Sequence, residues 1–146
     1  DLPGYILFYY NQAIELCLKE YYAEAIQKLN TLFRKVSFKN IFFIEVELKL
    51  FLAVLYIFNK DEEHSSVIIR NTSRRISEYK DNEKYLSAIH CIKFLKTFNK
   101  KSVNKNDEKN ISLYQLFKVN NSGRYRIFKF LWLKDELLTR LIIKQR

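Results

Sequence analysis

Imidazole, thiol and carboxylate side chains build most catalytic and metal sites, and this chain places few of them at useful spacing. His64 and His90 are the only two histidines. Asp61 lies three residues before His64, with Glu62 and Glu63 between them, a grouping that would suit a cation site. Acidic residues also complement the positive end of a helix dipole, and we favour that interpretation here.

The other reactive groups do not form an acid–base or nucleophile–base pair. His90 and Cys91 are sequence neighbours, so they point to different faces of a helix. Two further pairs of neighbouring carboxylates are Glu45 with Glu47 and Asp135 with Glu136. These pairs have no acid–base partner close by in the sequence. We therefore predict a protein without enzyme activity, without a bound metal and without a cofactor.

The scarcity of glycine and proline excludes the common phosphate- and cofactor-binding loops. Gly4, Gly123 and Pro3 are the only such residues, whereas average usage predicts roughly 10 glycines and 7 prolines. Dinucleotide-binding loops, P-loops and nucleophile elbows each need two or more closely spaced glycines. Residues 5–122 contain neither residue type, which favours helices joined by polar turns over β-hairpins, whose turns need positive φ.

The net charge of +10 is confined to the C-terminal part of the chain. Residues 1–92 carry 12 basic and 12 acidic side chains, whereas residues 93–146 carry 14 basic and 4 acidic ones. The candidate contacts for an acidic protein segment or a nucleic acid are Lys100, Lys101, Lys105, Arg124, Arg126 and Lys129. Tyr125, Phe128 and Phe130 alternate with the last three; they could stack on bases, but we favour a place in the core.

Two cysteines and one apolar stretch bear on the cellular environment. Cys17 and Cys91 each lie in an apolar helical pattern, and we predict two buried, reduced thiols, typical of a reducing compartment such as the cytoplasm. Residues 41–58 are long and apolar but include Glu45, Glu47 and Lys49. Ionised groups are costly at the centre of a bilayer, so we predict a core helix and no membrane span. Asp1 in place of methionine suggests a fragment of a larger protein.

Hydrophobic periodicity predicts an all-α chain. The first three expected helices cover residues 5–19, 22–36 and 40–58, with Asn40 as the cap of the third. A capping box at Asn59 and Glu62 opens a fourth, and Asp81 or Asn82 begins a fifth that ends near residue 98. The last two cover residues 107–119 and 124–144. Residues 5–98 would form helical hairpins, 99–110 a polar linker, and 111–146 a basic capping segment, all within one domain covering 1–146. An alternative for residues 113–127 is a β-hairpin around the Asn120–Gly123 turn.

Small residues recur at a spacing of about 40. Ala13 and Ala53 are 40 residues apart, as are Ala25 and Ser65. Around them, the first unit offers Tyr9, Ala13, Leu16, Tyr22, Ala25, Leu29 and Leu32, and the second offers Leu52, Ala53, Tyr56, Ser65 and Ile69. In this pattern the chain resembles the tetratricopeptide repeat (TPR) family over residues 5–98. It departs from the family in three ways. Glu20 and Lys60 stand where the family has its turn glycine, and the period is longer than the 34-residue unit. In the third unit, the polar linker takes the place of the second helix.

The resemblance implies a short right-handed superhelix of antiparallel hairpins that acts as a scaffold for protein association. Its binding face would be lined by first helices, at positions such as Gln12, Glu15 and Lys19. The expected partner is a protein or peptide. A nucleic-acid-binding or regulatory domain that uses the basic C-terminal segment is the alternative. Either the last helix or a second copy of the chain would cover the apolar face of the incomplete third unit. The sequence therefore allows both a monomer and a homodimer.

Overall fold

The computed structural model describes residues 2–79, 83–99, 107–129 and 134–144, and every regular element in them is an α-helix. The helices are α1 (Leu2–Leu18), α2 (Tyr22–Lys35), α3 (Phe42–Phe58), α4 (Glu62–Ser77), α5 (Leu86–Lys96), α6 (Asp107–Asn120) and α7 (Lys134–Lys144). The all-α class predicted from the sequence is confirmed. The β-hairpin alternative for residues 113–127 is wrong, because this part of the chain contains no strand.

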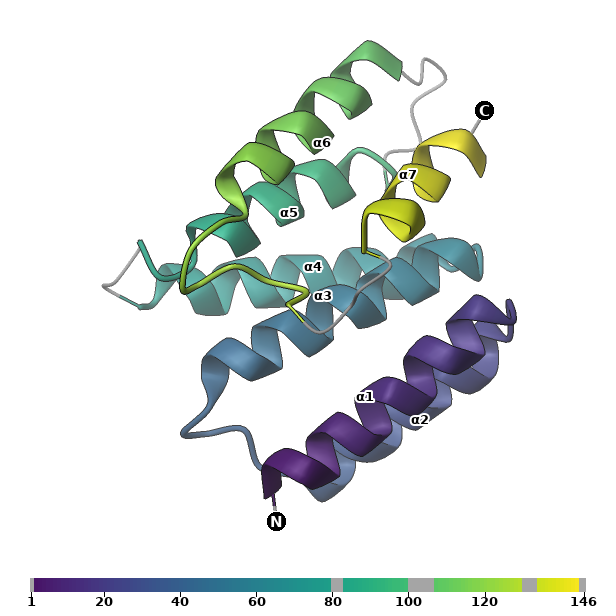
Figure 1. Cartoon of the computed structure of the whole chain (residues 1–146), viewed down its shortest axis with the longest axis vertical. Helices are drawn as coiled ribbons and strands as arrows, with labels where there is room; N and C mark the ends of the chain where they lie inside the picture. The colour runs from purple at the N-terminus through teal and green to yellow at the C-terminus, as the bar shows by residue number, and fades with distance from the viewer. Residues whose placement is uncertain (1, 80–82, 100–106, 130–133, 145–146) are drawn as a thin grey trace.

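The helices are arranged as three pairs that stack in chain order (Figure 1). α1 packs along α2, α3 along α4, and α5 along α6. α2 then contacts α3, while α5 contacts both α3 and α4, so the middle pair joins the outer two. α7 packs against α6. The third pair therefore has a second helix: it is α6, which begins at Asp107, within the predicted linker of residues 99–110.

The middle pair forms the centre of the core because α3 is covered on several sides. Almost every side chain of α3 is buried, including Phe51 and Leu55, which have no exposed surface. The charged side chain of Glu45 in this helix is held by Arg75 of α4, whose Nη1 lies 2.8 Å from Glu45 Oε2. None of the helices in the described ranges is long and apolar enough to cross a membrane.

The 40-residue spacing seen in the sequence corresponds to equivalent positions in the first two helix pairs. Ala13 in α1 and Ala53 in α3 are both fully buried, as are Ala25 in α2 and Ser65 in α4. Small side chains at these positions let the paired helices approach closely. Ser65 also donates a hydrogen bond from Oγ to the carbonyl oxygen of Ala53, over 3.1 Å, whereas Ala25, the equivalent residue of α2, has no hydroxyl group to donate.

The same spacing relates the two tight turns. Glu20 and Lys60 have φ angles of 64° and 59°, in the left-handed region. The amide of Tyr21 donates to the carbonyl of Leu16, and that of Asp61 donates to the carbonyl of Tyr56. These bonds between residues five positions apart define Schellman motifs, in which glycine usually occupies the left-handed position. Both turns have no glycine, but Glu20 and Lys60 adopt the conformation that glycine favours.

Replacing Glu20 with glycine is expected to stabilise the protein by about 0.5–1 kcal/mol. The left-handed conformation costs an L-residue roughly 1–2 kcal/mol, and the greater freedom of glycine in the unfolded chain cancels part of that gain. Equilibrium urea unfolding of wild type, Glu20→Gly and Glu20→Ala measures the effect. The alanine variant retains Cβ and is the matched control. Equal stabilities for the glycine and alanine variants would show that this turn stores no strain.

Two predicted helix starts are corrected. Asn40 does not cap α3: the amide of Ile41 bonds to the carbonyl of Phe38, and Ile41 becomes the N-cap residue without a side-chain bond. Asn59 does not open α4 either, because it is the C-cap of α3. The N-cap of α4 is Asp61, whose Oδ1 accepts the amide of His64 at 3.1 Å. α5 begins at Leu86; the predicted start at Asp81 or Asn82 lies outside the described residues.

The predicted helix over residues 124–144 is wrong in its first part. The structure has an irregular loop up to residue 129, and α7 begins at Lys134. Two left-handed residues, Gly123 with φ 78° and Phe128 with φ 59°, interrupt any helix. Asn121 replaces the missing backbone bonds, since its Oδ1 accepts the amide of Ile127 at 2.7 Å and its Nδ2 donates to the carbonyl of Ile127 at 3.0 Å.

The two cysteines are buried and neither forms a disulfide bond, as predicted. Neither has exposed surface, and Cys17 and Cys91 lie in α1 and α5 as part of the hydrophobic core. Burial raises the pKa of the Cys91 thiol far above its usual range. Because the thiolate is the reactive form, this side chain is inert in the folded protein.

Candidate functional site

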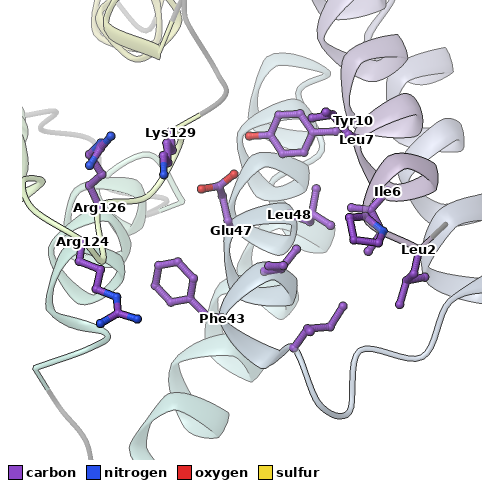
Figure 2. Close-up of a pocket in the computed structure, with 13 residues that line it drawn as sticks. Leu2, Ile6, Leu7, Tyr10, Phe43, Glu47, Leu48, Arg124, Arg126 and Lys129 are labelled. Carbon is purple, nitrogen blue, oxygen red and sulfur yellow. The ribbon is translucent and has the colours of Figure 1, made fainter.

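A groove with apolar and basic walls lies where α1, the start of α3 and the loop of residues 124–129 meet (Figure 2). We call it the α1–α3 groove, and its cavity volume is about 370 Å³. It is lined by Leu2, Pro3, Ile6, Leu7 and Tyr10 of α1; by Ile41, Phe43, Ile44, Glu47 and Leu48 at the start of α3; and by Arg124, Arg126 and Lys129 of the loop. Cavities of this size hold small ligands or a few side chains of a partner.

The apolar wall follows from helical spacing. The α1 residues that line the groove recur at three- and four-residue intervals, so they lie on one face of that helix. Leu7 and Ile44, from the two facing helices, are 40% and 41% exposed. Single large apolar side chains are common on protein surfaces, but a cluster of them in a concave site is typical of a binding surface.

The basic wall is held in place by one buried phenylalanine. Phe128 has no exposed surface, and its amide donates to Glu47 Oε1 at 2.6 Å. This bond joins residues 81 positions apart and fixes the loop against α3. Arg126 Nη1 donates to the carbonyl of Gly123 at 2.7 Å, which stiffens the loop further. As a result, Arg124, Arg126 and Lys129 all border the same groove.

The polar end of the groove is formed by Tyr10 and Glu47. Figure 2 shows the Tyr10 ring directed toward the Glu47 carboxylate from the opposite helix. The Tyr10 side chain is only 3% exposed. Burial, and next the negative charge of Glu47 and a hydrogen bond to its carboxylate, raise the pKa of Tyr10 well above its ordinary value. Tyr10 therefore stays protonated, with its hydroxyl buried beside Glu47.

The structure brings together some predicted contact residues and separates others. Arg124, Arg126 and Lys129 share the α1–α3 groove, whereas Lys100, Lys101 and Lys105 lie outside the described residues. On α1, the positions of Gln12, Glu15 and Lys19 fall on the face opposite Ile6 and Tyr10, by the 100° rotation per residue of an α-helix. Glu15 and Lys19 form an exposed ion pair of 3.4 Å there.

The aromatic residues of the basic segment are partly in the core, as favoured from the sequence. Phe128 is buried, while Tyr125 is half-buried and packs edge-on against Phe43 with ring centroids 6.0 Å apart. Lys84 Nζ lies 5.7 Å from the centroid of the Tyr125 ring. Phe130 lies outside the described residues. The aromatic rings of this segment thus support the loop more than they offer free faces for stacking.

Of the groups singled out for metal or acid–base chemistry, Asp61 and His64 bond to each other, whereas the Nδ1 atom of His90 is buried without a hydrogen-bond partner in the described part of the chain. His64 Nδ1 lies 2.8 Å from Asp61 Oδ2, and the His64 ring stacks on Tyr56 with centroids 5.2 Å apart. The hydrogen bonds from His64 lower the pKa of Asp61. Within the described ranges, no three His, Cys, Asp or Glu side chains are grouped closely enough to hold a metal ion. Burial, and then the charge of Lys93, lower the pKa of His90.

Sequence reasoning missed Leu7 and Glu47 as groove residues. In the sequence, Glu47 was a carboxylate with no acid–base partner close by, and its neighbours in the structure come from α1 and from the loop after α6. A signal was present: a glutamate within the most apolar stretch of the chain must have a polar partner when it is buried. The sequence did not reveal which partner.

The chain matches no protein-family model, no curated protein and no solved structure. The assignment of a function therefore depends on the geometry and chemistry of the surfaces described above.

Proposed function

We propose that this protein is a non-enzymatic scaffold of TPR-like helical hairpins, which binds an acidic, apolar-anchored segment of a partner protein in the α1–α3 groove. The 40-residue equivalence of the first two pairs supports a repeat architecture. Two buried cysteines that form no disulfide bond fit a reducing compartment such as the cytoplasm. The groove lies between the first helices of the first two pairs, although at other residues than those predicted.

The single observation that carries this proposal is the pairing of an apolar cavity with a basic rim. Bulky side chains of a partner would be removed from water between Leu7 and Ile44. The three cations of the 124–129 loop would attract carboxylates that flank those side chains. Glu47 is the one carboxylate among the lining residues, and it is engaged by the amide of Phe128.

Selection from a displayed library of random peptides tests the proposal. We expect the retained sequences to contain aspartate or glutamate next to leucine, isoleucine or an aromatic residue. Leu7→Asp and Arg124→Glu should each weaken binding of the selected peptides by at least about tenfold, equivalent to about 1.4 kcal/mol. Both positions are exposed enough to change without loss of the fold, which circular dichroism would verify.

Lys19→Glu is the matched control because it reverses a charge on the opposite face of α1. It should leave peptide binding unchanged. Two results would reject the α1–α3 groove as the binding site. The first is a set of selected peptides without an acidic preference. The second is peptide binding that is weakened by Lys19→Glu but not by Leu7→Asp. The second result would favour the face of Gln12, Glu15 and Lys19.

A further inference from the structure

A second groove, unrelated to the first, runs between α4 and α5. It consists of two adjoining cavities of about 400 and 430 Å³, which share Ser73 and Lys96. Isoleucines of both helices, among them Ile69 and Ile92, form its floor. We call it the α4–α5 groove. Its composition differs from that of the α1–α3 groove because hydroxyl groups, cations and the amide of Asn99 provide its polar side-chain groups, and no carboxylate lines it.

Four cations border this groove, two from each helix: Arg70 and Arg74 from α4, and Lys93 and Lys96 from α5. All four side chains are exposed, and none forms a salt bridge with another described residue. Like charges four apart on a helix, as Arg70 and Arg74 are, repel each other. Nothing in the fold requires this concentration of positive charge, so a ligand with negative charge is the simplest reason for it.

The arginines were not apparent as part of a basic surface in the sequence. Residues 1–92 are neutral as a whole, and Arg70 and Arg74 belong to that part of the chain. α4 carries its acidic residues at its ends, with Glu62 and Glu63 in the first turn and Glu78 at the C-cap. Packing of α5 beside the basic middle of α4 then adds two lysines and produces a local excess of charge.

We infer that the α4–α5 groove binds the sugar–phosphate backbone of a nucleic acid strand, independently of base sequence. Serine hydroxyls and arginine or lysine side chains are the usual partners of phosphate oxygens, and Ser66 and Ser73 lie in the groove beside the cations. From Ser66 to Ser77 the helix rises about 16 Å, the axial length over which one DNA strand presents about five phosphates.

The chemistry of the two grooves separates their ligands. In the α1–α3 groove exposed leucine and isoleucine dominate the lining, which suits a peptide with apolar side chains better than a chain of phosphates. In the α4–α5 groove no aromatic side chain lines the cavities, so stacking of bases contributes nothing there. Binding should therefore depend on the phosphates and be strongly weakened by salt.

The test is the salt dependence of binding to a fluorescein-labelled single-stranded DNA oligonucleotide, followed by fluorescence anisotropy. Four phosphate contacts predict a slope of about −2.8 in log K against log salt, or about 50-fold weaker binding at 200 mM than at 50 mM salt. In the double variant Arg70→Gln/Arg74→Gln, the slope should fall to about −1.4 and the weakening to about 7-fold. Both residues are exposed, and melting curves would show that the fold is kept.

Two double variants with the same net charge serve as controls. Lys19→Gln/Arg34→Gln changes the first pair of helices, and Arg124→Gln/Arg126→Gln changes the α1–α3 groove; both should keep a slope near that of wild type. The inference is overturned if wild type does not bind at 50 mM salt, or if only the Arg124→Gln/Arg126→Gln variant loses the slope. It is also overturned if polyglutamate displaces the DNA at equal charge concentration, since that result would assign the groove to acidic proteins.

Discussion

Phe128→Ala is expected to lower the free energy of unfolding by about 3–5 kcal/mol, the usual cost of truncating a buried phenylalanine. The side chain has no exposed surface, although it belongs to an irregular loop. Its removal would also release the amide that donates to Glu47, leaving a buried carboxylate less well satisfied. Urea unfolding followed by circular dichroism measures the loss, with Phe8→Ala in α1, where the ring is 57% exposed, as the matched control.

Phe128→Gly separates packing from backbone strain at the same site. Phe128 has a φ of 59°, which glycine adopts without the steric penalty of roughly 1–2 kcal/mol that alanine retains. The glycine variant should therefore be more stable than the alanine variant, though still well below wild type. If Phe128→Ala costs no more than Phe8→Ala, the loop does not depend on Phe128, and the placement of the basic wall would need another explanation.

The helices that sequence periodicity predicted best are those whose burial pattern is local. The prediction of a helix over residues 22–36 differs from α2 only at its last residue, and the core helix over 40–58 differs from α3 by two residues at its start. In both cases the side chains that face the core repeat every three or four positions, and no distant contact competes with the helix. The caps were less accurate, because Asn40, Asn59 and Asp61 are all plausible caps and turn hydrogen bonds select between them.

The loop of residues 124–129 shows what the sequence could not provide. Apolar residues at 125, 127 and 128 fit a helix as well as a loop that turns its side chains inward. The choice depends on Glu47, which lies 81 residues from Phe128 in the chain and accepts its amide. A contact at that distance leaves no periodic signal, so the local pattern favoured the wrong structure.

The candidate sites were predictable in their charge but not in their composition. The uneven charge distribution drew attention to Arg124, Arg126 and Lys129, which do lie together. Their apolar neighbours come from α1 and α3, and the basic α4–α5 groove combines residues from the neutral and the basic parts of the chain. Both surfaces arise from the stacking of helix pairs, which a single sequence does not specify.

Ala53→Leu is expected to destabilise the protein by about 1–3 kcal/mol. Ala53 is fully buried in α3 where α4 crosses it, and the carbonyl of Ala53 accepts the Ser65 hydroxyl. A leucine there has no space and must displace the helices or adopt a strained rotamer. Ala23→Leu on the exposed side of α2 is the matched control; it adds the same atoms to a helix and should leave urea unfolding nearly unchanged.

The equivalent change one repeat earlier tests the architecture itself. If Ala13 has the same role in the α1–α2 crossing as Ala53 has in the α3–α4 crossing, Ala13→Leu should be destabilising by a similar amount. The loss should be somewhat smaller, because Ala25 in α2 has no hydroxyl group to bond across the crossing as Ser65 does. A large effect at Ala53 with none at Ala13 would mean that the 40-residue spacing is coincidental and that the two helix pairs are not units of one repeat.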